Sequence, residues 1–271
     1  MTRLRILLAL LLAFSWPPTV ARAQSDTLRY EFHYEPDAGQ GARVAVDLRF
    51  RGSRSGRTGI VIPTSWAGED SLGRAIVGFD AGPDVEVSGV SAGQRLLTHL
   101  RGARIHIHYV LRQDWAGRLR YPQYHRVIVD SARVVFNESN GLIYPEHAAG
   151  ETLVVQYQWS GLPVDWRILT SFGQKASFSG PASWRELASA SFAAGAFRLI
   201  SAGTRVGGMT IEAQGNWRFS DAALAQVVQS LWTAETAFWG GGAFNHAFVL
   251  LLPISNTDVL AGTAFTAGFV A

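Results

Sequence analysis

The sequence predicts a mainly β protein in which an N-terminal antiparallel β-sandwich is followed by an α+β segment. From Leu28 to about Thr170, apolar and polar residues alternate in steps of two, which is the pattern of half-buried strands. Turn residues such as Asn140-Gly141 separate these runs at short intervals. The one long helical pattern lies in the last third of the chain. Together these observations favour a sandwich of about 145 residues before the α+β segment.

Residues 1–23 have the three successive regions of a secretory signal peptide. Arg3 and Arg5 precede an apolar run, and Ala21-Arg22-Ala23 gives the small-x-small pattern that signal peptidase cleaves. We therefore expect cleavage between Ala23 and Gln24, and export to the periplasm or secretion. The apolar run is far shorter than the roughly 20 residues that span a bilayer. We expect no permanent membrane anchor; the alternative is an uncleaved anchor.

The overall charge and the absence of cysteine exclude several classes of function. Removal of residues 1–23 would take the basic residues from 24 to 21, equal to the 21 acidic residues, because Arg3, Arg5 and Arg22 are lost. A neutral body gives no electrostatic support for a nucleic-acid partner. With no cysteine, the chain has no disulfide, no thiolate metal site and no lipoprotein anchor.

The periodicity changes beyond Gly173. We expect a short helix after Gly180-Pro181, strands at 197–201 and 209–219, and then a helix capped by Ser220 and ended by Gly240. Its apolar stripe is formed by Leu224, Val227, Val228, Leu231 and Trp232. A buried strand at 247–252 and a strand-like run at 265–271 follow. The chain stops inside this apolar run, so we expect either a covering partner or a longer parent protein.

Gly89-Val90-Ser91-Ala92-Gly93 matches the G-x-S-x-G nucleophile elbow of serine hydrolases. The elbow requires a sharp turn from a strand into a helix. Only the short segment 94–100 follows before Arg101-Gly102, and its surroundings have a β pattern. A hairpin turn is therefore the favoured interpretation. A serine hydrolase that uses Ser91, with His125 or His147 as the base, remains an alternative.

His106 and His108 are two residues apart on a predicted strand and therefore face the same side. Such a pair can hold a metal when a third ligand is supplied, but the sequence indicates none. The alternative is the solvent side of an ordinary strand. No His-Glu pair occurs anywhere, so the His-Glu-x-x-His zinc motif is missing. We predict no catalytic residue, no metal ligand and no cofactor in this chain.

Four segments, taken in order, resemble one protein family. Ile62-Pro63 with Trp66 and Gly68 resembles a Pro-x-Trp-x-Pro-Gly turn, although Trp66 is shifted by one residue and Ala67 replaces the second proline. The other three are Gly161–Trp166 running into Leu169-Thr170, Phe238-Trp239-Gly240 with Phe244, and Ala261–Thr266. They resemble a Leu-Pro-x-x-Trp segment, a Phe-Gly-x-x-Pro-Phe segment and a Gly-Gly-x-x-x edge strand. All four are similar to segments of the glycyl aminopeptidase-type family of periplasmic zinc metallopeptidases.

This resemblance implies a domain organisation and a site. The family has a β-domain, a thermolysin-like catalytic domain and a PDZ domain, which would place the β-sandwich at 24–172 and an incomplete thermolysin-like domain at 173–271. Gly262, Thr263 and Ala264 would contact the backbone of a peptide substrate in a full-length relative. The zinc ligands would lie beyond Ala271, so zinc is expected in such a relative and this chain alone is expected to be inactive.

A non-enzymatic interpretation remains open beside this resemblance. The chain would then be a periplasmic β-sandwich binding module for carbohydrate or peptide. Trp115 or Trp159 would serve in it as a stacking platform at the surface.

Overall fold

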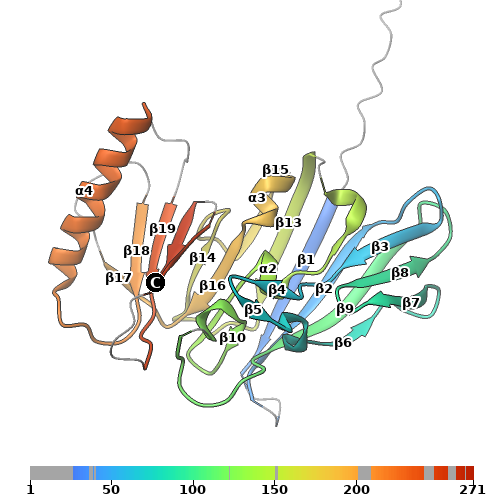
Figure 1. The fold of residues 1–271 in the computed structure, drawn as a ribbon, viewed down its shortest axis with the longest axis horizontal. Coiled ribbons are helices and arrows are strands. Elements are labelled where there is room, and N and C mark those ends of the chain that lie inside the picture. Colours follow the sequence, from blue (N-terminus) through green and yellow to red (C-terminus); the bar gives the residue numbers. More distant parts are fainter. Residues whose placement is uncertain are drawn as a thin grey trace, which may run out of the picture.

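The computed structural model describes residues 27–36, 39, 41–121, 123–149, 152–200, 209–240, 247–255, 261–265 and 267–271. The predicted signal peptide 1–23, its cleavage between Ala23 and Gln24, and Phe244 lie outside the described residues. The described chain consists mostly of strands in several sheets (Figure 1), which confirms the mainly β fold class. None of the described helices is long and apolar enough to cross a membrane.

The largest sheet has six strands, in the order β15 (Ser177–Ser183), β13 (Thr152–Ser160), β1 (Thr27–Glu35), β2 (Arg43–Arg51), β9 (Arg104–Arg112) and β6 (Ile76–Asp80). All neighbours are antiparallel except β1 and β13, which run parallel. The sequence alternation fixes which side chains point inward, since every second residue of β1 is buried.

Two four-stranded sheets and a hairpin complete the N-terminal architecture. One sheet has the order β10 (Ile128–Val129), β11 (Arg133–Asn137), β16 (Ser191–Gly195) and β14 (Arg167–Thr170). The other has the order β12 (Tyr144–Pro145), β3 (Arg57–Val61), β8 (Gln94–Thr98) and β7 (Glu86–Ser91). The hairpin is β4 (Ser65–Trp66) with β5 (Glu69–Asp70), and the short helices are η1 (Leu72–Ala75), η2 (Gln123–His125), α2 (Glu138–Gly141), η3 (Glu146–Ala148) and α3 (Trp184–Ala188).

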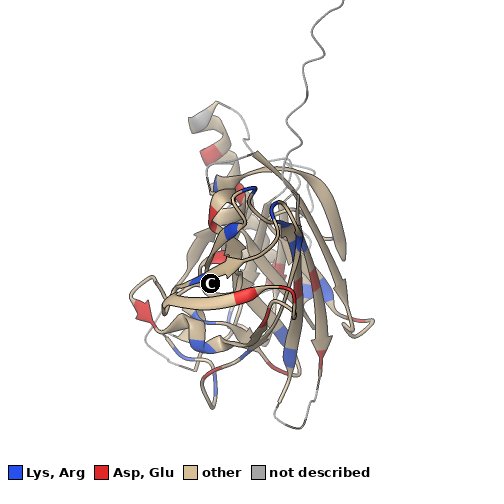
Figure 2. Cartoon of the chain, turned by 90° about the vertical axis from the view of Figure 1, so that its right-hand side faces the viewer, with Lys and Arg blue, Asp and Glu red and all other residues tan. Residues whose placement is uncertain are grey.

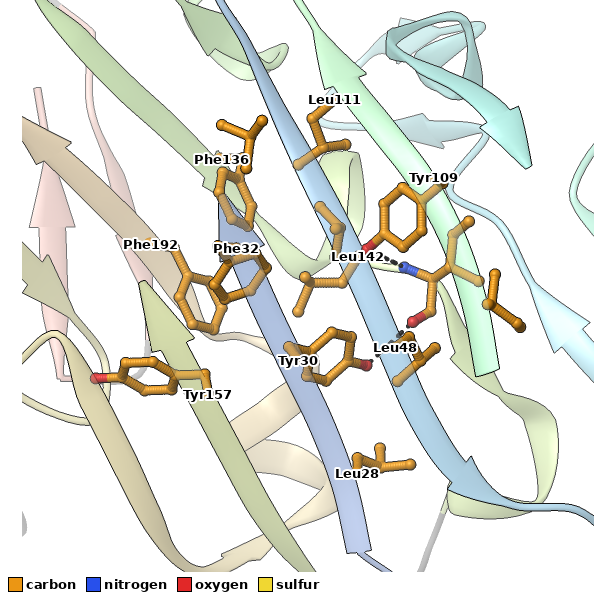
Figure 3. Packing of buried hydrophobic residues seen from close by; sticks show 14 of the residues in the cluster. Leu28, Tyr30, Phe32, Leu48, Tyr109, Leu111, Phe136, Leu142, Tyr157 and Phe192 are labelled. Carbon is orange, nitrogen blue, oxygen red and sulfur yellow. Dashed lines mark hydrogen bonds between the residues drawn. The ribbon is translucent and has the colours of Figure 1, made fainter. Parts of the chain in front are cut away.

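Aromatic side chains from three of these strands fill the centre of the main core (Figure 3). The ring of Phe32 lies 5.4 Å from that of Phe136 and 5.5 Å from that of Phe192. Two buried tyrosine hydroxyls donate to backbone carbonyls at the end of α2 and just beyond it. Tyr109 donates to the carbonyl of Gly141 at 3.3 Å, and Tyr30 donates to that of Ile143 at 3.0 Å. The core is therefore closed without unpaired tyrosine hydroxyls at these two positions.

The prediction that Trp159 forms a stacking platform at the surface is wrong, because its side chain is buried. It is 4% exposed, and its ring lies 4.7 Å from that of Phe32. On β13 it is in phase with the buried Val155 and Tyr157, so the strand alternation places it in the core.

The C-terminal sheet has five strands, in the order β17 (Arg198–Ile200), β18 (Met209–Ala213), β19 (Ala247–Leu251), β21 (Gly268–Val270) and β20 (Thr263–Phe265). The central pairs β18–β19 and β19–β21 are parallel, and the outer pairs are antiparallel. Helix α4 (Asp221–Trp239) stands beside this sheet at one end of the molecule (Figure 1). The Ser220 hydroxyl caps it, and Gly240 ends it with φ 76°, as predicted.

Strand pairing continues past the predicted boundary between residues 172 and 173. β15 pairs with β13, and β16 pairs with both β11 and β14. Phe192 on β16 belongs to the same core as Phe32. The boundary stays a prediction, and this pairing favours a position beyond Gly195.

Candidate functional site

Strand β20 contains two of the three residues predicted to contact a peptide, Thr263 and Ala264, and Gly262 precedes it directly. β20 is the last strand of its sheet, and its outer side pairs with no other strand of the described chain. A Cβ atom at Gly262 would collide with the ring of Phe269, so glycine lets that ring lie close against the chain. The predicted residues therefore form a free sheet edge.

The inner face of β20 packs against the N-terminal sheets. Thr263 and Phe265 share this face because they are two residues apart on one strand. The Thr263 hydroxyl lies 3.5 Å from that of Tyr124, and the ring of Phe265 lies 5.9 Å from that of Trp66. Two side chains from distant parts of the chain thus support the edge strand.

Trp66, Tyr121, Tyr124, His125 and Phe265 make up what we call the aromatic group. Trp66 meets the ring of His125 edge-on at 5.0 Å, and the rings of Tyr124 and His125 lie 3.9 Å apart. Trp66 is presented by the tight turn between β4 and β5, in which Ala67 has φ 52° and Gly68 has φ 83°. Proline cannot adopt a positive φ, so this turn could not hold a proline at position 67.

His125 is buried inside the aromatic group. It is 6% exposed, and its backbone carbonyl accepts a hydrogen bond of 2.9 Å from the Asn140 amide. Burial lowers the pKa of His125 below its ordinary value, and the Glu69 carboxylate opposes this shift only in part. Its Nδ1 atom has no hydrogen-bond partner among the described residues.

Arg126 ties the β4–β5 hairpin to the aromatic group. Its guanidinium donates to Asp114 at 3.2 and 3.0 Å, to Glu69 at 3.3 Å, and to the carbonyl of Asp70 at 2.9 Å. The side chains of Arg126 and Asp114 are only 11% and 6% exposed. Breaking such a buried pair is costly, so the hairpin is held firmly in place.

A cavity of about 10 Å³ lies between β20 and the N-terminal sheets and is large enough for about one water molecule. Asn137 and Ser191 line it from directly opposite positions on β11 and β16. The Asn137 Oδ1 and Ser191 Oγ atoms are buried and have no partner within the described part of the chain.

Glu138 lies next to this cavity wall, at the start of α2, and is 7% exposed. Burial raises its pKa from 4.5 to about 7, against hydrogen bonds from the side chains of Ser139 and Tyr144. Asn137, Glu138 and Ser191 were not among the site residues predicted from the sequence. The available signal was the run of four polar residues 137–140 directly after the apolar residues 134–136.

The other sequence candidates lie elsewhere and form no catalytic set. Ser91 ends β7 and pairs with Gln94 across the turn to β8, so it occupies a strand-to-strand hairpin and not a nucleophile elbow. His106 and His108 do share a face, and both bond to Oδ1 of Asp47, at 2.6 and 3.2 Å. Desolvation alone would raise the pKa of Asp47, but these hydrogen bonds and the histidine charges outweigh it and lower the pKa.

The described residues contain no group of three His, Cys, Asp or Glu side chains placed to hold a metal ion. Asp47 already bonds both nearby histidines through one oxygen atom, so these three groups satisfy each other. Figure 2 shows acidic and basic residues interspersed over one side of the molecule. The absence of a nucleic-acid partner stays a prediction.

The sequence matches no family model and no curated protein. Solved structures do share its fold. An aminopeptidase N family protein from Idiomarina loihiensis matches with a TM-score of 0.70 and 14% identity, over 90% of this chain and 41% of that one. An M1 zinc metallopeptidase from Deinococcus radiodurans matches with a TM-score of 0.51 and 11% identity, over 90% of this chain and 59% of that one.

A mutant of the Deinococcus radiodurans protein bound to a Tyr-Ser-Ala substrate matches with a TM-score of 0.52 and 11% identity, over 91% of this chain and 60% of that one. This chain therefore spans less than two thirds of the length of each of these structures. At such low identity the comparisons establish the fold alone, which is that of the N-terminal region of these proteins.

Proposed function

We propose that this chain is the N-terminal part of an exported aminopeptidase-like protein and supplies the edge strand on which a peptide substrate binds. One observation carries the proposal: β20 leaves a sheet edge free directly beside the aromatic group. The fold shared with aminopeptidase N family structures supports the same assignment.

The free edge would bind a peptide as an additional strand. Main-chain hydrogen bonds supply the affinity in this mode of recognition, and nearby side chains select the residues of the peptide. Gly262 has no side chain, which lets another backbone approach closely. Contacts of Thr263 with Tyr124 and of Phe265 with Trp66 keep the strand in position.

The described residues do not fit a catalytic zinc ion, since no suitable donor set is present among them. The sequence also contains no His-Glu pair. We propose that zinc and its ligands belong to a further segment of a full-length protein, in which a PDZ domain is also expected. This chain alone would then bind peptides without hydrolysing them.

A titration of the whole chain with the tripeptide Tyr-Ser-Ala, followed by NMR amide shifts, tests the binding mode. We expect shifts of the Thr263 and Ala264 signals at millimolar tripeptide. A tripeptide methylated on its backbone nitrogens should cause much smaller shifts, because it lacks the donors that extend a sheet. Equal shifts with both peptides would rule out strand addition.

Two glycine variants provide the matched comparison for this titration. Gly262→Ala should abolish the shifts, because its Cβ collides with Phe269 and displaces the edge. Gly89→Ala is the control, since a Cβ there meets no atom within 4 Å. Unchanged binding by Gly262→Ala would remove this residue from the site.

Export is tested separately by expression in a bacterial host. We expect to find the protein in the periplasm, with a measured mass that corresponds to a chain beginning at Gln24. Replacement of Ala23 by Arg should block cleavage, because the peptidase requires a small residue there. A cytoplasmic product with residues 1–23 intact would refute export.

A further inference from the structure

A second cavity, of about 440 Å³, lies between residues 113–119, residues 130–133 and residues 253–255. Its size is within the range of small-ligand sites. In Figure 1 the segment between β9 and β10 runs along the lower edge of the molecule toward the C-terminal sheet. The Ser255 backbone N–H and hydroxyl both donate to the carbonyl of Leu119, at 2.8 and 3.0 Å, and join two sides of the cavity.

On the third side of this cavity, formed by residues 130–133, the side chains of Asp130 and Arg133 already form hydrogen bonds with neighbouring groups. Oδ1 of Asp130 accepts from the backbone N–H groups of Ala132 and Arg133, at 2.8 and 3.0 Å, and its Oδ2 accepts from the Arg133 guanidinium at 3.2 Å. Arg133 also donates to Gln214. These groups shape the cavity but have little capacity left for a ligand.

Three other lining side chains have unused polar groups. The Trp115 Nε1–H donor and the Gln113 Oε1 acceptor are buried, and neither has a hydrogen-bond partner in the part of the chain that the structure describes. Buried polar groups without partners are rare and call for an explanation. Arg118 at the rim is exposed, and its guanidinium forms no ion pair or hydrogen bond with the described residues.

The remaining lining is apolar, from Leu119, Pro253 and Ile254. Trp115 packs partly against the buried cluster that includes Leu119 and Leu252, so it is not a free platform for stacking a sugar. The cavity thus has a cation and an apolar wall at its surface, while the Trp115 N–H donor and the Gln113 carbonyl acceptor lie buried in its lining.

We propose that this cavity binds the C-terminal end of a peptide whose last residue is apolar. The terminal carboxylate pairs with Arg118, for which a planar guanidinium is well suited. A peptide carbonyl accepts from Trp115, a peptide N–H donates to Gln113, and the last side chain packs on Leu119, Pro253 and Ile254. The inference is independent of the peptide edge at β20.

Calorimetric titration of the whole chain with N-acetyl-Ala-Leu tests the proposal. We expect saturable binding, weakened at least about ten-fold when the peptide carries a C-terminal amide in place of its carboxylate. Arg118→Gln should weaken binding of the free acid about ten-fold. Equal affinity for the acid and the amide, or tighter binding of glucuronate than of the peptide, would overturn the proposal.

Control variants distinguish binding at this cavity from a general effect of charge and from binding at β20. Arg120→Gln removes the same charge two residues away, outside the cavity lining, and should change the dissociation constant less than two-fold. Gly262→Ala should leave it unchanged. Trp115→Phe removes the indole donor together with part of the ring, and should weaken binding in a protein whose circular dichroism spectrum is unaltered. Full affinity in Arg118→Gln would refute the site.

Discussion

The strands of the N-terminal sheets and helix α4 bury their apolar residues to very different extents. Along β1, Tyr30 and Phe32 are at most 1% exposed. Along α4, Ala225 is buried, but Val227 and Leu231 on the predicted apolar stripe are 56% and 61% exposed. Apolar burial is the main stabilising term in folding. We therefore expect the N-terminal sheets to carry most of the stability and helix α4 to open at a lower free energy.

The largest effect should come from the centre of the N-terminal core. Phe32→Ala removes a ring that contacts Phe136, Phe192 and Trp159, and should lower the free energy of unfolding by about 3–5 kcal/mol. Urea unfolding measures this loss. Val164→Ala is the control, because Val164 is fully exposed and should change the free energy by less than about 0.5 kcal/mol. A loss below about 1 kcal/mol in Phe32→Ala would contradict the comparison.

Glu138 makes the stability of the same core depend on pH. Its pKa is raised from 4.5 to about 7, so the folded protein holds a proton that the unfolded chain releases. The stabilisation from protonated Glu138 is fully present below about pH 4.5 and is lost as the pH rises to about 7. The free energy of unfolding should fall by on the order of 3 kcal/mol over this range. Glu138→Gln should remove that part of the pH dependence. Urea unfolding at pH 4.5, 6 and 8 measures it.

The control for this experiment is Glu86→Gln, on the exposed strand β7. It should retain the fall in stability between pH 4.5 and 7. Identical pH profiles for Glu138→Gln and the unsubstituted protein would show that Glu138 is ionised in the folded state near pH 6.

Ala67 offers a smaller, stabilising change beside the aromatic group. Its φ of 52° lies in the left-handed region, which costs a residue with a Cβ roughly 1 kcal/mol. Ala67→Gly should therefore raise the free energy of unfolding by up to about 1 kcal/mol. Thermal unfolding measures the gain, and Ala45→Gly, on the extended strand β2, should lower stability instead. A loss of stability in Ala67→Gly would show that the turn differs in solution.

The strands could be predicted because their signal is local. The alternating run 104–109 lies within β9, and the run 152–157 lies within β13, each ended by turn residues. The pairing of strands could not be predicted in the same way. β1 and β13 are parallel neighbours more than a hundred residues apart, and no local pattern encodes their register.

The candidate site shows the same division between local and distant information. The position of Thr263 and Ala264 on an edge strand followed from the family resemblance. The cavity beside them depends on Asn137 facing Ser191 across β11 and β16, and on Tyr124 reaching Thr263. These contacts join segments that lie far apart in the sequence, so periodicity and spacing could not reveal them.

The smallest expected effect tests the exposed half of the α4 stripe. Leu224 and Leu231 occupy the same helix, but Leu224 packs against the cluster of Ile200 and Ile211, whereas Leu231 is mostly exposed. Leu224→Ala should lower the free energy of unfolding by about 1–2 kcal/mol, and Leu231→Ala by less than about 0.5 kcal/mol. Urea unfolding of the two variants gives a matched comparison. An equal loss in both would mean that Leu231 is buried in solution, and that α4 is as well covered as the strands of the N-terminal core.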